Sequence, residues 1–152
     1  MKHYDKLIFV SESDTATSPM AEAVLQKQLM LEDILIQSKG LVVLFPEPVN
    51  PKAEAILAGN SLSMKEHQSE QLLEEDFDER TLVLTMNSSE KEKLLAHYQH
   101  PQNVFVLREY IQGENEIYDP LGGVLADYGR LFEKIRADVE RLGEILKAEE
   151  AD

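Results

Sequence analysis

The chain has 152 residues, 43% of them hydrophobic, and carries 15 Lys and Arg against 29 Asp and Glu, a formal net charge of −14. This length corresponds to one domain, residues 1–152. So acidic a chain is poorly suited to bind nucleic acid or an anionic membrane surface, because both need Lys and Arg to neutralise phosphate. The chain contains no cysteine, which excludes disulfides, thiolate metal ligands and thiolate nucleophiles.

The beginning of the chain shows no targeting signal. The apolar run Leu7–Val10 is shorter than the hydrophobic region of a secretory signal. No apolar run approaches the ~20 residues that a membrane span requires. We therefore expect a cytoplasmic protein.

Short β-prone segments alternate along the chain with segments of helical periodicity. The predicted strands are Leu7–Val10, Ile34–Gln37, Leu82–Leu84 and Asn103–Leu107. Helix starts are predicted where a capping side chain precedes a proline or an acidic partner: Ser18 before Pro19, Asn50 before Pro51, and Ser89 with Glu92. Gly59 is the predicted stop after the second of these helices.

The last helix has the clearest pattern. Its apolar residues recur at alternating steps of three and four: Leu125, Tyr128, Phe132, Ile135, Val139, Leu142 and Leu146. Alternation of strands and helices implies right-handed crossovers and a mainly parallel sheet. We therefore expect an α/β fold, a three-layer α/β/α domain around a four-stranded parallel sheet. Its ligand crevice should lie beyond the carboxyl ends of the strands.

The loop that follows the first strand is a candidate binding site. It joins a strand end to a helix start, where unpaired N–H groups and the helix dipole favour an anion. Spacing alone equally fits an ordinary β–α connection without chemistry. The loop residues that could meet a ligand are Glu12, Ser13, Asp14, Thr15, Ala16 and Ser18.

Several motifs occur in an order that resembles the low-molecular-weight protein tyrosine phosphatases. Ser18-Pro19-Met20-Ala21-Glu22 is identical to the end of that family's loop signature. Tyr118-Asp119-Pro120-Leu121-Gly122-Gly123 is similar to its motif before the last helix. Shorter matches lie between them: His67-x-Ser69-x-x-Leu72, Leu84-Thr85-Met86 and Leu107-x-Glu109-Tyr110. Thr15 adds a similarity to the bacterial branch that includes protein arginine phosphatases.

The resemblance implies a flavodoxin-like fold and a phosphatase mechanism. In the family, a cysteine thiolate attacks phosphorus, a loop arginine holds the phosphoryl oxygens, and an aspartate protonates the leaving group. Here the nucleophile position is Ser11, the arginine position is Thr17 and the acid position is Asp119. Other family positions also differ: Ser13, Asp14 and Ala16 replace the loop glycine, asparagine and second cysteine, and Leu121 replaces an aromatic residue.

These substitutions remove the parts that the chemistry needs. A serine hydroxyl cannot be ionised by loop N–H groups, as a thiol can, and requires a general base. Thr17 offers neither a charge nor the two-pronged hydrogen bonding of a guanidinium. Glu12 and Asp14 add charge that repels phosphate. We expect weak or absent phosphate binding and no turnover through a phosphocysteine.

The sequence therefore favours an inactive phosphatase relative, a pseudophosphatase acting as a binding or regulatory module. An active phosphomonoester hydrolase that uses Ser11 or water with Asp119 is the first alternative, and a cation- or small-ligand-binding protein is the second. The expected partner is an unidentified protein or small ligand, with no nucleic acid, no membrane and no cofactor. The oligomeric state stays open.

The remaining candidates have simpler interpretations. Carboxylates of Glu12, Asp14 and Asp119 could hold a hard cation, but no metal-loop spacing supports this. The four histidines lack zinc-ligand spacing, so we expect them at the surface or paired with other side chains. The acidic run 74–79 is most simply a solvated face, with docking of a basic protein as the sharper alternative.

Overall fold

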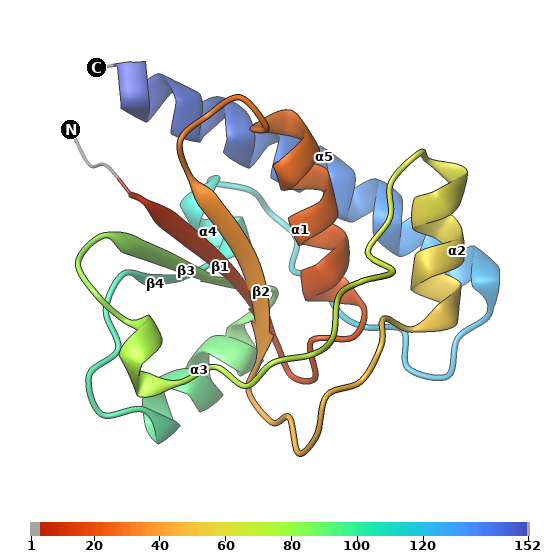
Figure 1. The fold of residues 1–152 in the computed structure, drawn as a ribbon, viewed down its shortest axis with the longest axis horizontal. Helices are drawn as coiled ribbons and strands as arrows, with labels where there is room; N and C mark the ends of the chain where they lie inside the picture. The colour runs from red at the N-terminus through yellow and green to blue at the C-terminus, as the bar shows by residue number, and fades with distance from the viewer. Residues whose placement is uncertain (1–3, 152) are drawn as a thin grey trace.

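Four parallel strands form the centre of the computed structural model, which describes residues 4–151 (Figure 1). They are β1 (Lys6–Ser11), β2 (Leu35–Gly40), β3 (Thr81–Thr85) and β4 (Val104–Val106). Their order in the sheet is β2-β1-β3-β4, which matches the first four strands of the flavodoxin-like order 2-1-3-4-5. Ser11 pairs with Gly40 in the register of β1 and β2, so these two strands end level with each other.

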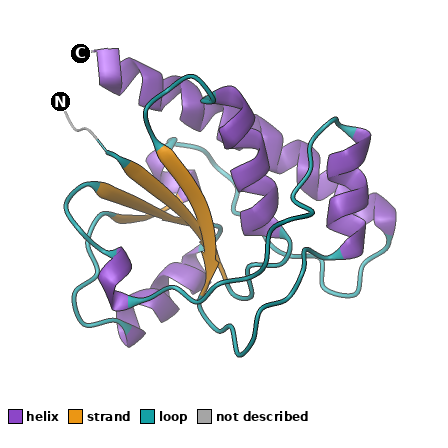
Figure 2. Ribbon diagram, viewed as in Figure 1, coloured by secondary structure: helices purple, strands orange, loops and turns teal. Residues whose placement is uncertain are grey.

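Helices cover both faces of this sheet (Figure 2). They are α1 (Thr17–Gln28), α2 (Pro51–Gly59), α3 (Ser88–His97), α4 (Leu107–Tyr110) and α5 (Leu125–Ala151), with a short 3₁₀ turn, η1 (Glu74–Asp76). α1 packs against α5 on one face, and α3 lies on the other face (Figure 1). The predicted three-layer α/β/α fold with a four-stranded parallel sheet is thus confirmed.

The alternation of side chains along the strands separates two cores. On β1, Leu7 and Phe9 pack with α1, α2 and α5, including Phe132. Ile8 and Val10 point to the opposite face and pack with Leu94 of α3. Strands buried on both faces read as continuous apolar runs, which explains why Leu7–Val10 shows no alternation in the sequence.

Some predicted helix ends are wrong. α1 begins at Thr17 after Ala16, and the Ser18 hydroxyl caps nothing because it bonds within the preceding loop. α3 begins at Ser88, and its cap is Asn87, whose side chain accepts from the N–H of Glu90. The predicted box of Ser89 with Glu92 is therefore two residues late.

The predictions for α2, α5 and the acidic run 74–79 are confirmed in part. Asn50 caps α2 as expected, accepting from the N–H groups of Lys52 and Ala53. Gly59 is the last residue of α2 rather than the residue beyond it. The apolar stripe of α5 is buried from Tyr128 onward, but Leu125 is half exposed. Within the acidic run 74–79, Asp76 is buried and bonds to Lys39, so the run is not entirely a solvated face.

The loops after β1 and β2 and the segment before α5 lie at the carboxyl end of the sheet (Figure 1). This is where the fold class places a ligand crevice. Among residues 4–151, no helix is both long enough and apolar enough to cross a membrane.

Candidate functional site

A tight loop, residues 12–16, connects the end of β1 to the start of α1. Its turn depends on Asp14, whose φ of 58° lies in the left-handed region that Asp tolerates better than most residues. The Asp14 N–H folds back and donates to the Ser11 Oγ at 2.9 Å. Ser13 and Thr15 share a hydroxyl–hydroxyl hydrogen bond of 2.7 Å on the same loop.

A chain of hydrogen bonds starts at the hydroxyl of Ser11. The Ser18 Oγ donates its proton to the Asp14 Oδ1 at 2.8 Å. Ser18 therefore accepts at its other contact, the 2.6 Å approach to the Ser11 Oγ, and Ser11 is the donor. Hydrogen-bond donation therefore runs from the Ser11 hydroxyl to the Ser18 hydroxyl, and from there to the carboxylate of Asp14.

Asp14 is completely buried and receives further donors from the segment before β3. The His67 Nε2 lies 3.0 Å from the Asp14 Oδ2, and the N–H of Glu70 donates to the same oxygen at 3.2 Å. Burial pushes the pKa of His67 down, but the hydrogen bond and charge of Asp14 outweigh it and hold that pKa above its usual value. The Asp14–His67 pair thus ties the loop to the segment before β3.

The sequence interpretation missed this role of His67. Fifty-three residues separate His67 from Asp14, and no local spacing joins them. The available signal was the match of the segment His67-x-Ser69-x-x-Leu72 to the family pattern. A histidine therefore lies near Ser11, although Asp14 and Ser18 separate its ring from the Ser11 hydroxyl.

A second buried carboxylate borders the same pair. Burial raises the pKa of Glu22 on α1, and hydrogen bonds from Ser38 together with the charge of His67 partly offset the rise. Ser38 also lies 3.4 Å from the His67 Nε2. His67 is thus flanked by Asp14 from the loop and by Glu22 from α1.

On the other side of the loop, Glu90 of α3 holds the backbone. Its carboxylate accepts from the N–H of Glu12 and from the N–H of Met86, each at 3.0 Å. Burial raises the pKa of Glu90 to about 7, despite these backbone donors. The Glu12 side chain itself is at the surface, 3.2 Å from Lys93. The N–H of Glu12 is therefore already committed to a carboxylate.

The predicted arginine position holds a small buried side chain. Thr17 is the first residue of α1 and is 3% exposed. Residues 12–16 contain no cationic side chain, and Thr17 adds none. The loop therefore presents no guanidinium with which to grip a phosphoryl group.

Asp119 is half-buried on the segment before α5 and is linked to the loop through two residues. The Tyr128 hydroxyl donates to the Asp119 Oδ1 at 3.4 Å and accepts from the Asn50 side chain at 3.4 Å. The Asn50 N–H in turn donates to the carbonyl of Thr15 at 2.8 Å. Burial raises the pKa of Asp119, as a general acid requires, although Tyr128 lowers it in part.

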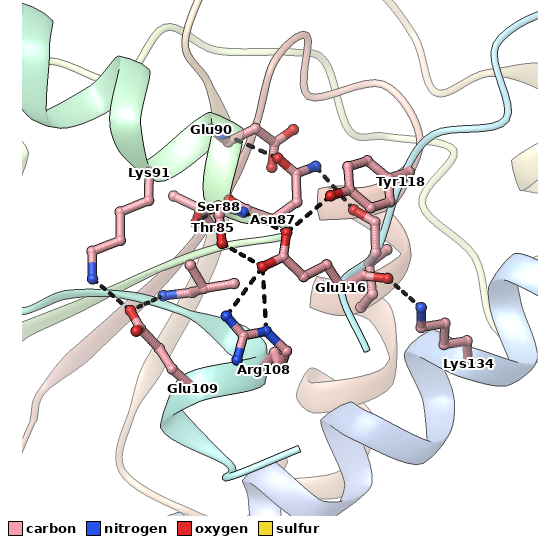
Figure 3. A network of polar contacts seen from close by, with 12 residues as sticks. Thr85, Asn87, Ser88, Glu90, Lys91, Arg108, Glu109, Glu116, Tyr118 and Lys134 are labelled. Carbon is pink, nitrogen blue, oxygen red and sulfur yellow. Dashed lines mark hydrogen bonds and ion pairs between the residues drawn. The ribbon is translucent and has the colours of Figure 1, made fainter. Parts of the chain in front are cut away.

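A polar cluster fixes the segment that carries Asp119 (Figure 3). Glu116 accepts from the N–H of Ser88 at 2.9 Å, from Arg108 at 3.1 Å and from the Tyr118 hydroxyl at 3.0 Å. Hydrogen bonds from Ser88, then from Tyr118 and Arg108, lower the pKa of Glu116 to about 2. The N–H of Ile117 also donates to the carbonyl of Met86, just beyond β3. The segment just before Asp119 is therefore anchored by hydrogen bonds to Ser88, Arg108 and Met86.

The acidic side chains near the loop do not converge on one point. Asp14 is engaged with His67, Ser18 and Glu70, and Glu12 points to Lys93. Among residues 4–151, no group of three or more His, Asp or Glu side chains is arranged to hold a metal ion.

The Asp14–His67 pair predicts a pH dependence of stability. Because the pKa of folded His67 is raised, the pair contributes fully below the unfolded value of about 6.5 and is lost as pH rises through the folded pKa. The free energy of unfolding should therefore fall as the pH rises above about 6.5 in urea titrations. His67→Gln should reduce this fall, and an unchanged pH dependence in that variant would contradict the pairing.

Comparison with known proteins agrees with this geometry. Residues 6–152 match the family described as low molecular weight phosphotyrosine protein phosphatase. The low molecular weight protein-tyrosine-phosphatase PtpB of Staphylococcus haemolyticus is 31% identical over 130 residues, 86% of this chain and 91% of the relative.

Solved structures of relatives superpose closely. The YwlE arginine phosphatase from Geobacillus stearothermophilus has a TM-score of 0.89 at 26% identity, covering 96% of this chain and 95% of the other. A cysteine-to-serine mutant of YwlE arginine phosphatase, with a phosphorylated active-site serine, has a TM-score of 0.84 at 28% identity, covering 93% and 95%. This chain therefore belongs to the low-molecular-weight protein tyrosine phosphatase family.

Proposed function

We propose that this family member is catalytically silent and works as a binding or regulatory module, a pseudophosphatase. The supporting observation is the hydrogen-bond chain from Ser11 through Ser18 to Asp14. It holds the nucleophile position as a neutral hydroxyl and ends on a buried carboxylate inside the loop. A loop built in this way has little affinity for a phosphate dianion.

The energetic balance supports the same conclusion. An arginine at position 17 would add two charge-assisted hydrogen bonds to a phosphoryl group, each worth roughly 1.5–3 kcal/mol. Thr17 supplies neither. The N–H groups of Glu12 and Asp14 are bonded to Glu90 and Ser11 and cannot make up that loss without rearrangement.

A slow serine-dependent hydrolase is the second candidate, and one observation favours it. The proton of Ser11 could pass through Ser18 to Asp14 as the serine oxygen attacks phosphorus, with Asp119 protonating the departing alkoxide or phenoxide. Water deprotonated by Asp119 would then displace the serine oxygen from phosphorus, and Asp14 would return the proton to Ser11 through Ser18. The related YwlE mutant with a phosphorylated active-site serine shows that a serine in such a loop can carry a phosphoryl group. Against this route, both carboxylate oxygens of Asp14 already accept hydrogen bonds, one from Ser18 and the other from His67 and the N–H of Glu70.

Hydrolysis of para-nitrophenyl phosphate between pH 5 and pH 8, followed by intact mass spectrometry, tests the two candidates. We expect no turnover above buffer and no phosphorylated protein, because the loop lacks both an anionic nucleophile and a cation. Ser11→Ala and Asp119→Asn are the controls. Release of phosphate that disappears in both variants would establish the hydrolase and refute the pseudophosphatase.

A further inference from the structure

A pocket of about 150 Å³ lies at the amino ends of the strands, away from the loop of Ser11. Its walls come from Tyr4 before β1, from the turn between α1 and β2, and from the last turns of α5. Figure 1 shows the start of β1, the turn between α1 and β2, and the end of α5 close together at one end of the molecule. The apolar part of the lining is Tyr4, Leu29, Ile34 and Leu146.

Large apolar side chains stand exposed next to this pocket. Met30 is 74% exposed and Leu31 is 94% exposed. Both belong to the turn between α1 and β2, which forms one wall of the pocket. An apolar patch continuous with a pocket is typical of a surface that another molecule covers.

The rim of the pocket is strongly acidic. Glu32 and Asp33 contribute from the α1–β2 turn, and Glu149 and Glu150 contribute from α5. Among the described residues of the lining, Lys147 is the one cationic side chain. Four carboxylates against one ammonium group give the pocket a negative field, which attracts a basic ligand and repels an acidic one.

We propose that this pocket and its patch, residues 29–35 with 146–150, dock a basic segment of a partner protein. One large apolar side chain of that segment enters the pocket, whose volume suits a benzene-sized group. Lys or Arg residues on either side of it meet the acidic rim. A second copy of this chain fits poorly, because it would bring its own charge of −14 against the same rim. The inference is independent of what the Ser11 loop does.

The test uses a synthetic amphipathic Leu/Lys peptide and two matched peptides, one with Glu for every Lys and one with Ala for every Leu. Amide chemical shifts of the full chain map the contact, and calorimetry gives the affinity. We expect shifts within residues 29–35 and 146–150, with both matched peptides at least tenfold weaker. The docking surface is refuted by no binding, or by shifts centred elsewhere.

Paired variants separate this surface from the general acidity of the chain. Met30→Ser with Leu31→Ser should weaken binding about tenfold, and both side chains are exposed enough to leave the fold intact. Glu32→Gln with Asp33→Asn should weaken it about fivefold, less so at high salt. The control Glu75→Gln with Glu92→Gln removes two exposed charges from η1 and α3, away from the pocket, and should change the affinity less than twofold.

Two further outcomes would overturn the proposal. Equal weakening by the control pair would mean that the peptide responds to net charge alone. A concentration-dependent dimer in sedimentation velocity that Met30→Ser with Leu31→Ser abolishes would make a second copy the occupant of the patch.

Discussion

Restoring the family's loop chemistry should give this chain clear oxyanion binding. The variant combines Ser11→Cys, Ser13→Gly, Asp14→Asn and Thr17→Arg. It introduces a thiol whose pKa the loop can lower, removes the buried carboxylate and adds a guanidinium fork. Two charge-assisted hydrogen bonds together are worth roughly 3–6 kcal/mol, so vanadate should bind at least about a hundredfold more tightly than to the parent chain.

Thermal stability followed during vanadate titration measures this gain, because a ligand that binds only the folded state raises the melting temperature. The matched control keeps Thr17 and changes the other three positions, and it should recover much less affinity because it lacks the cation. If the complete variant stays as silent as the parent chain, then the loop backbone itself, held by Glu90 at Glu12, has lost the anion-binding shape. In that case the four side chains would not explain the expected lack of oxyanion binding.

The parts of the fold that local patterns could predict are the regular ones. The strand Leu7–Val10 follows from its continuous apolar run, which is typical of a strand buried on both faces, and the buried stripe of α5 from Tyr128 to Leu146 follows from its helical periodicity. Helix starts were less predictable. Ser18 has the residue type of a cap, yet tertiary contacts with Asp14 and Ser11 take its hydroxyl.

In the site, too, some residues could be predicted from the sequence and others could not. Ser11 and Thr17 could be placed by motif position, and the structure puts them at the end of β1 and the start of α1. The partners of the loop could not be predicted, because His67 and Glu90 come from segments far away in the sequence. Their roles depend on the fold. Once buried, the polar groups of the loop must pair with whichever polar side chains lie beside them, however far away those are in the sequence.

Asp14 should prove the most sensitive position of the loop for stability. Asp14→Ala would remove the acceptor of three donors: the Ser18 hydroxyl, the His67 ring and the N–H of Glu70. It would also place alanine at a φ of 58°, which alanine adopts less readily than Asp or Asn. Breaking a buried charge pair by deleting one partner typically costs about 3–5 kcal/mol.

At roughly 2–4 °C per kcal/mol for a domain of this size, the melting temperature of Asp14→Ala should fall by roughly 6–20 °C in calorimetry. Asp14→Asn keeps one acceptor oxygen and tolerates the same backbone, so its loss should be less than half as large. Glu12→Ala is the matched acidic control, since it removes only an exposed pair with Lys93 worth about 0–1 kcal/mol. Equal melting temperatures for Asp14→Ala and Glu12→Ala would mean that the buried carboxylate does not hold the loop after β1 in a form that excludes phosphate.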